Sequence, residues 1–207
     1  MAGFSIMSKY VFKQQDQEHS LPNKIVVGLQ RISEAFKVLL WEKAKEFGIS
    51  PIQIQILIFI SYHKEEFCNV SYLAKEFNVT KPTISDAIKV LEKKEMIVKD
   101  HSSSDSRSYS IFLSDLGKET VSKTETFANP IKTALGDISG EEQENIFSTL
   151  SSLIYQLNQK GILTVQRTCY ACKFHTIHGT TDYCNLLQKD LLNQDIRLDC
   201  AEFESAS

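Results

Sequence analysis

The fold of this chain is decided by residues 70–117, whose sequence is VSYLAKEFNVTKPTISDAIKVLEKKEMIVKDHSSSDSRSYSIFLSDLG. Ser71 can cap a short helix over residues 72–77, because a serine side chain accepts a hydrogen bond from an N–H of the first helical turn. After a three-residue turn, Thr80 can cap a second helix that begins at Lys81 and has a proline in its first turn, where the missing N–H costs nothing. The pattern predicts two helices joined by a tight turn.

Two short strands are predicted after these helices, over residues 97–99 and 109–113. They flank residues 101–108, a loop without any apolar side chain, so the simplest interpretation is a β-hairpin with a long polar tip. Helix, turn, helix and hairpin together make a winged helix-turn-helix. In that motif the second helix can enter the major groove of DNA, while the hairpin tip reaches the adjacent minor groove or the backbone.

The second helix combines an apolar stripe with a polar arc. At about 100° per residue, the stripe of Ile84, Ala87, Ile88 and Leu91 lies opposite side chains that are short, polar or cationic. Lysines neutralise phosphates, hydroxyl groups bond bases or phosphates, and Asp86 can accept from a cytosine amino group but repels a phosphate. We therefore predict that the DNA contacts of this helix are Lys81, Pro82, Thr83, Ser85, Asp86, Lys89 and Lys93.

The hairpin tip contributes two further candidates. Arg107 carries the only guanidinium of the loop, and Asp105 can pair with it and fix its direction, which suits a narrow minor groove. With Lys99 added, few cations face DNA on a chain of net charge −3, so we expect modest affinity and strong salt dependence. Taken singly, the helix face and the serine-rich loop are more often plain solvated surface. Their order and spacing favour DNA binding.

The stretch 70–117 resembles the MarR-type regulators of multiple drug and stress response. The resemblance is specific at Leu73 and Ala74, at residues 91–94, and at the wing residues 105–107 with 113–117. It implies a homodimer in which the first helix and the last two interdigitate, with two winged modules one DNA turn apart on a pseudo-palindrome and the wing arginine in the minor groove. Glu95 departs from the family, which commonly has glycine there, so the turn into the first wing strand is expected to differ.

Apolar residues spaced by three and four predict flanking helices, so the fold class is mainly α. One long helix covers residues 22–47 and ends at Gly48, and a helix interrupted near Pro130 starts after Ser114. Residues 52–60 alternate like a strand, but Ser50 and a following proline favour a helix buried on all sides. A last helix opens with the capping box Ser139 to Glu142. The predicted parts are an N-terminal arm at 1–21, a first dimerisation helix at 22–48, the winged helix-turn-helix at 49–113, C-terminal dimerisation helices at 114–160, and a cysteine-rich metal-binding extension at 161–207.

Four of the five cysteines lie in the last part of the chain, at Cys169, Cys172, Cys184 and Cys200. In a reducing compartment this clustering favours four thiolates around one metal ion over a disulfide framework. Zinc is the first choice of cofactor, and an iron–sulfur cluster would accept the same ligands. The tail has few large apolar residues for a core of its own, and a metal could supply the missing folding energy. His175 and His178 are either substitute ligands or plain loop residues, and Cys68 is either a small buried hydrophobe or a lone sensing thiol.

The 207 residues, 42% of them hydrophobic and 24% charged, have the composition of an ordinary soluble globular protein. The longest apolar run, residues 56–60, is far shorter than the roughly 20 residues of a membrane helix, and the N-terminus lacks a secretory signal. A cytoplasmic protein without membrane contact is therefore expected. No phosphate loop, nucleophile elbow or pair of catalytic acids is recognisable, which argues against an enzyme.

These observations predict a sequence-specific regulator that binds double-stranded DNA as a homodimer, acts as a repressor and carries a metal site in its tail. Two alternatives stay open. One is a metal- or redox-responsive switch that senses through the tail cysteines and repositions the dimerisation helices. The other is a winged-helix protein-interaction module that does not bind DNA. The sequence does not identify the operator or a small-molecule effector.

Overall fold

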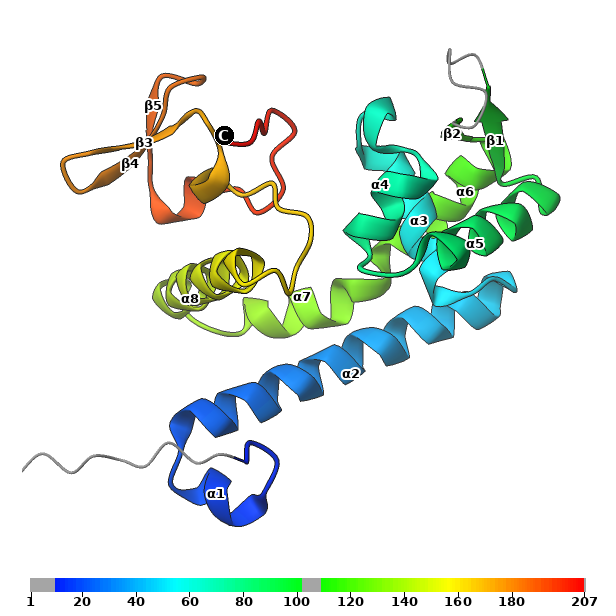
Figure 1. Ribbon diagram of the computed structural model, residues 1–207. Coiled ribbons are helices and arrows are strands. Elements are labelled where there is room, and N and C mark those ends of the chain that lie inside the picture. Colours follow the sequence, from blue (N-terminus) through cyan, green and yellow to red (C-terminus); the bar gives the residue numbers. More distant parts are fainter. Residues whose placement is uncertain (1–9, 102–108, 207) are drawn as a thin grey trace, which may run out of the picture. The chain divides into compact units, whose positions relative to one another are not determined.

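The computed structural model describes residues 10–101 and 109–206 (Figure 1). The chain is mainly helical and divides into two compact units, Met1–Ile54 and Gln55–Ser207. Within the described residues, no helix is both long enough and apolar enough to cross a bilayer.

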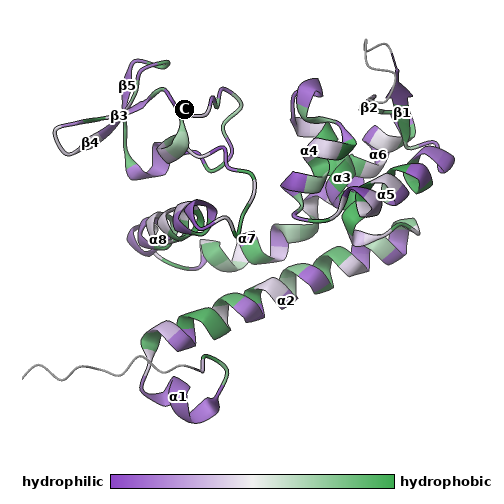
Figure 2. Cartoon of the chain, viewed as in Figure 1, coloured by the Kyte–Doolittle hydropathy of each residue, from purple (hydrophilic) through white to green (hydrophobic). Residues whose placement is uncertain are grey.

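The first unit contains the short helix α1 (Gln14–Glu18) and the long helix α2 (Leu21–Phe47). Ser20 caps α2 by accepting a hydrogen bond from the N–H of Asn23, and Gly48 ends it with a left-handed φ of 61°. The long helix expected over residues 22–47 is therefore confirmed. Within the N-terminal arm expected over residues 1–21, α1 and the Ser20 cap are present. Polar and apolar bands alternate along α2 (Figure 2).

The second unit holds the predicted helix-turn-helix. Helix α3 (Pro51–Tyr62) spans the boundary between the units. The elements that follow it are η1 (Glu65–Phe67), α4 (Val70–Glu76), α5 (Lys81–Lys93), β1 (Ile97–Asp100), β2 (Ser110–Leu113), α6 (Asp115–Thr124), η2 (Glu125–Ala128), α7 (Asn129–Gly136) and α8 (Gly140–Gln159). Residues 52–60 are helical, as Ser50 and the following proline indicated. The predicted interruption near Pro130 is the η2 turn ahead of α7, and the Ser139 capping box is present.

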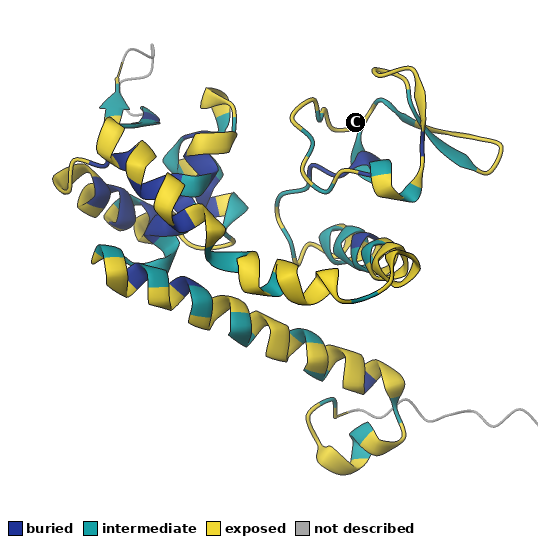
Figure 3. Cartoon of the chain, turned by 180° about the vertical axis from the view of Figure 1, so that it is seen from behind, coloured by how far each residue is buried: buried dark blue, intermediate teal, exposed yellow. Residues whose placement is uncertain are grey.

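The core of the second unit is formed where α3, α4 and α5 pack together (Figure 3). Its fully buried side chains include Leu57 of α3, Leu73 of α4 and Ile111 of β2, together with the apolar stripe of α5. Burying a leucine or isoleucine side chain contributes about 1.5–3 kcal/mol, so this cluster dominates the stability of the unit. It also fixes the direction in which α5 presents its other face.

The turn between α4 and α5 follows the prediction with one correction. Asn69, and not Ser71, caps the first helix, because its side chain accepts from the N–H of Tyr72 at 2.9 Å, so the helix starts at Val70. Thr80 caps α5 as expected, accepting from the N–H of Thr83 at 3.3 Å. Asparagine and serine can both cap a helix, and Asn69, two positions earlier, takes the role.

Strands β1 and β2 pair antiparallel, with Ile97 opposite Leu113 and Asp100 opposite Ser110, which confirms the hairpin. Most of the predicted polar tip, residues 102–108, lies outside the described residues. Glu95 enters β1 with a φ of 57°, in the left-handed region that favours glycine. The position therefore keeps the backbone conformation that the glycine of the family would adopt most easily.

The cysteine-rich tail folds as a small three-stranded antiparallel sheet with two short 3-10 turns. Its elements are η3 (Cys169–Ala171), β3 (His175–His178), β4 (Thr181–Cys184), β5 (Lys189–Leu191) and η4 (Asn193–Asp195), with the strands in the order β3-β4-β5. Cys169, Leu191 and Ile196 form a small buried cluster, and Phe147 of α8 packs against it. The expectation that the tail cannot build a core of its own was therefore wrong in part, because these three tail residues form one, which Phe147 of α8 extends.

Gly117 lies in the first turn of α6, directly against Met96 in the turn between α5 and β1. A β-carbon on this residue would lie 2.0 Å from the carbonyl oxygen of Met96, a distance that requires a backbone shift. We expect Gly117→Ala to lower the free energy of unfolding by about 1–3 kcal/mol. The measurement is the midpoint of urea unfolding, followed by circular dichroism.

Gly136→Ala is the matched control, because a β-carbon at this exposed position of α7 meets no atom within 4 Å. Alanine has the higher helix propensity, so this variant should be unchanged or slightly stabilised. Equal midpoints for the two variants would contradict the close approach at Gly117.

Cys68 is a core residue that is only 2% exposed, and its main-chain oxygen accepts from the N–H of Ile111 at 2.8 Å. Burial, with a smaller contribution from the nearby Glu65 carboxylate, raises the pKa of its thiol to about 11. The thiolate is the reactive form, so Cys68 should be inert and not a sensing thiol.

We expect native protein at pH 8 to leave Cys68 unmodified by iodoacetamide, and protein in guanidinium chloride to be modified there fully. Peptide mass spectrometry measures both fractions. Alkylation of Cys68 at the same rate in the native and the denatured protein would show that the side chain is not enclosed.

Candidate nucleic-acid interface and cysteine cluster

The outward face of α5 follows from the burial of its opposite side. Ile84, Ile88 and Leu91 are fully buried and Ala87 is nearly so, which leaves the other arc toward solvent. The side chains expected to contact DNA from this helix lie on that arc: Lys81, Pro82, Thr83, Asp86, Lys89 and Lys93 are exposed, and Ser85 is half-buried. The geometry thus leaves this face accessible to a groove.

The polar groups on this face are partly paired with each other. Lys89 forms an ion pair with Asp86, with Nζ 3.0 Å from Oδ1, and the hydroxyl oxygens of Thr80 and Thr83 are 2.8 Å apart. Among the described residues, neither Lys81 nor Lys93 has an ion-pair partner. Lys81 and Lys93 can therefore bind a DNA phosphate without first breaking an ion pair, whereas Lys89 has to leave Asp86.

The remaining residues expected near DNA are Lys99, Asp105 and Arg107, and among the described residues none of them is seen on the exposed face of α5. The side chain of Lys99 is only 15% exposed, because its ammonium group bonds Glu92 and lies over the ring of Tyr109. The expectation that Lys99 faces DNA is therefore wrong for this conformation. Asp105 and Arg107 lie outside the described residues, so their place beside α5 stays a prediction.

All four tail cysteines line one small cavity of about 30 Å³. Cys169 is buried in η3, Cys184 ends β4, and Cys172 and Cys200 lie in the flanking loops. The fold therefore brings together thiols that are widely spaced in the sequence. Within the described residues, no group of three or more His, Cys, Asp or Glu side chains is arranged to hold a metal ion.

Two groups of Arg197 are directed at these sulfur atoms. Its main-chain N–H donates to the Sγ of Cys169 at 3.3 Å, and its guanidinium donates to the Sγ of Cys200 at 3.7 Å. Burial raises the pKa of Cys169, the Arg197 N–H lowers it, and the neighbouring thiolates raise it again. A cluster of thiols that repel one another when ionised is stabilised by a cation.

The two tail histidines differ in their positions, and both lie in β3 and not in a loop. His175 lines the cysteine cavity, where its Nε2 is 2.7 Å from Oδ1 of Asp182. His178 is exposed and stacks on the ring of Tyr183, with ring centroids 4.1 Å apart. Only His175 is close enough to the cysteines to be considered as a ligand.

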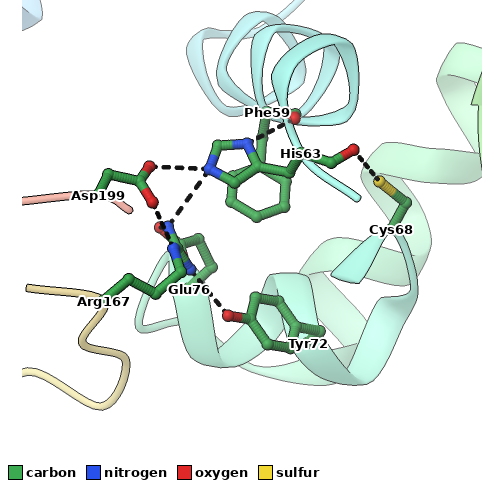
Figure 4. Close-up of polar contacts among 7 residues, drawn as sticks. All are labelled: Phe59, His63, Cys68, Tyr72, Glu76, Arg167 and Asp199. Carbon is green, nitrogen blue, oxygen red and sulfur yellow. Dashed lines mark hydrogen bonds and ion pairs between the residues drawn. The ribbon is translucent and has the colours of Figure 1, made fainter. Parts of the chain in front are cut away.

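Arg167 is buried at the centre of a polar cluster whose members are far apart in the sequence and were not predicted (Figure 4). Its guanidinium binds both carboxylate oxygens of Glu76 on α4, at 2.7 and 3.1 Å, and donates to the hydroxyl of Tyr72 at 2.8 Å. Its Nε donates to Asp199 at 2.5 Å. The Arg167 cluster, which we define as Arg167, Asp199, Glu76, Tyr72 and His63, therefore joins the tail to the first helix of the helix-turn-helix.

His63 at the end of α3 completes this cluster. Its Nε2 is 2.8 Å from Asp199 Oδ2, and its Nδ1 is 2.8 Å from the carbonyl oxygen of Phe59. Burial alone would lower the pKa of His63, but these two acceptors outweigh it and raise the pKa. The hydrogen bond from His63, together with Arg167, holds the pKa of Asp199 well below its usual range. An isolated arginine in a polar tail gives no sequence signal for such distant partners.

Further bonds join the same two regions. Thr164 donates to the main-chain oxygen of Lys75 at 2.5 Å, and the side chain of Asn78 donates to the main-chain oxygen of Ile162 at 3.4 Å. Lys64 and Glu202 form an exposed ion pair of 3.7 Å. The tail is thus attached to α4 and to the turn that precedes α5.

Comparison with known proteins identifies the winged domain. Residues 47–108 match the model of the MarR family. The crystal structure of the Staphylococcus aureus MepR–DNA complex is 26% identical with a TM-score of 0.55, and the match covers 62% of this chain and 94% of MepR. No curated protein matches the chain significantly.

Two more distant structures share the fold. A MarR protein from Peptoclostridium difficile is 21% identical, with a TM-score of 0.60 over 69% of this chain and 92% of its own. A MarR transcriptional regulator from Methanosarcina mazei is 18% identical, with a TM-score of 0.56 over 66% of this chain and 96% of its own. About a third of this chain is thus unmatched by them. Residues 47–108, the winged helix-turn-helix region, are therefore similar to the MarR family in sequence, and the fold of the chain is similar to that of MepR.

Proposed function

We propose that this protein is a transcriptional regulator that binds double-stranded DNA as a homodimer and represses by occupying its site. The observation that carries the proposal is the exposed polar face of α5, held outward by a fully buried apolar stripe. MepR, which is 26% identical, has been crystallised in complex with DNA. A helix of this kind, next to a hairpin, is the arrangement that reads a major groove.

The dimer is supported by the exposed apolar side chains of α2. Ile25, Ile32 and Phe36 lie on one face of the helix at about 100° per residue, and they are 51%, 50% and 41% exposed in the single chain. Apolar side chains gathered on one long helix favour burial against a partner. In the MarR-type dimer the first helix and the last two interdigitate, which would cover such a face. Two copies of α5 would then meet half-sites about 34–36 Å apart on a pseudo-palindrome.

The charge distribution sets the expected strength of binding. The net charge of −3 gives no general attraction to a polyanion, so affinity depends on the local cations. Lys81 and Lys93 can meet phosphates directly, whereas Lys89 first has to leave Asp86. Each phosphate contact contributes about −0.9 to the slope of log K against log salt. With Lys81 and Lys93 from each subunit, we therefore expect modest affinity with strong salt dependence, a slope of about −3.6 for the dimer.

Replacing both Lys81 and Lys93 by alanine should weaken binding to a fluorescent duplex of mixed sequence. The variant loses two phosphate contacts per subunit, so the salt slope should fall by about 0.9 for each lost contact. Fluorescence anisotropy titrations at several salt concentrations measure both quantities.

Two controls bracket this result. Lys160→Ala removes an exposed lysine at the end of α8 and should leave the titration unchanged. Asp86→Asn removes the carboxylate that pairs with Lys89 and repels phosphates, so it should tighten binding to non-specific DNA. If Lys160→Ala weakens binding as much as the double variant does, α5 is not the DNA-binding face.

A further inference from the structure

We propose that Cys169, Cys172, Cys184 and Cys200 bind one Zn²⁺. The bound metal would hold together the two tail segments that carry Arg167 and Asp199, and through these residues it would stabilise helix α4. The metal site is a property of the tail itself. Its effect on DNA affinity rests on the function proposed for the winged domain.

The size and lining of the cavity indicate a single metal ion. Pockets for drug-sized molecules measure about 300–1,000 Å³. The cavity lined by all four cysteines is far smaller, at about 30 Å³, which is room for one ion. Four thiolates are a ligand set that Zn²⁺ takes in tetrahedral structural sites.

The surroundings of the sulfur atoms also suit thiolate ligands. Metal-binding groups are usually oriented by hydrogen bonds from residues behind them. Arg197 donates from its main chain to Cys169 and from its guanidinium to Cys200, which are the most distant pair in the sequence. The η3 turn supplies the Cys169-x-x-Cys172 pair, and Cys184 comes from the paired strand β4. The described side chains are not arranged as a metal site, so the proposal requires that binding of the ion reorients the cysteines.

Two of the proposed ligands are close in sequence to Arg167 and Asp199, the residues that bond to the winged domain. Cys169 follows Arg167 by two positions, and Cys200 follows Asp199 directly. The two segments are joined by main-chain bonds, with the N–H of Cys200 donating to the oxygen of Arg167 at 3.1 Å and Arg167 bridged to Asp199. A metal that holds both cysteines therefore fixes the spacing of Arg167 and Asp199.

Helix α4 is short, and its C-terminal end is bonded to Arg167. It has seven residues, of which only Leu73 and Ala74 are buried. Arg167 holds its last residue, Glu76, by two bonds, and the guanidinium is almost fully enclosed. Removing one partner of a buried ion pair leaves an uncompensated charge. If the tail loosens, α4 and the turn into α5 lose their support.

The first test determines the metal. Full-length protein purified without chelator should contain one zinc per chain by elemental analysis, and Cys172→Ser or Cys184→Ser should contain none. Cys68→Ala is the matched control and should keep one zinc, since Cys68 lies in the winged domain away from the cavity. Absence of metal from the wild type, iron in place of zinc with visible colour, or loss of zinc in Cys68→Ala would each overturn the site.

The second test determines the coupling, by amide hydrogen exchange and DNA titration of the zinc-loaded full chain. Chelation should raise exchange over residues 70–76 and weaken DNA binding about tenfold, a size typical of coupling between sites. Arg167→Met, or the milder Glu76→Gln, should keep its zinc but already exchange fast in α4, so chelation should add little.

Lys64→Ala is the matched control for this second test, because it breaks an exposed ion pair between the same regions and should behave as wild type. An equal effect of chelation on α4 exchange in the wild type and in Arg167→Met would overturn the coupling. The exchange measurement does not need DNA. A protein that shows the predicted exchange without binding DNA would therefore refute the regulator and leave the coupling intact.

Discussion

The burial of Ile84, Ala87, Ile88 and Leu91 is the constraint on which the rest of the winged domain depends. These side chains fill the space between α5, α3 and α4, so α5 cannot rotate without exposing them. Their position leaves the lysines and hydroxyl groups of the opposite arc in solvent. The same packing that stabilises the fold therefore determines which surface can meet DNA, and the predicted function follows from a rigid orientation.

Local interactions explain why much of this domain could be predicted from the sequence. The Thr80 cap, the apolar stripe of α5 and the paired strands of the wing depend on residues close to each other in the chain. The error at the start of α4 is of the same kind, because Asn69 and Ser71 compete for one role over two positions. Such choices are settled by small differences in backbone conformation.

The Arg167 cluster could not be predicted, because its partners are distant in sequence. Arg167 and Glu76 are 91 positions apart, and neither belongs to a motif with fixed spacing. The pairing of Lys99 with Glu92 was missed for a related reason, since it depends on how β1 returns along α5. The tail cysteines were recognised by their number and spacing, but the small cluster around Leu191 and Phe147 depends on α8 and becomes visible only in three dimensions.

The measurement that tests the central claim most directly is amide hydrogen exchange of the full chain with and without a saturating DNA duplex. The account predicts that DNA slows exchange over residues 80–93, because α5 lies in the groove, and leaves the sheet of β3, β4 and β5 unchanged. Unchanged exchange over residues 80–93, with protection confined to the tail sheet, would contradict it.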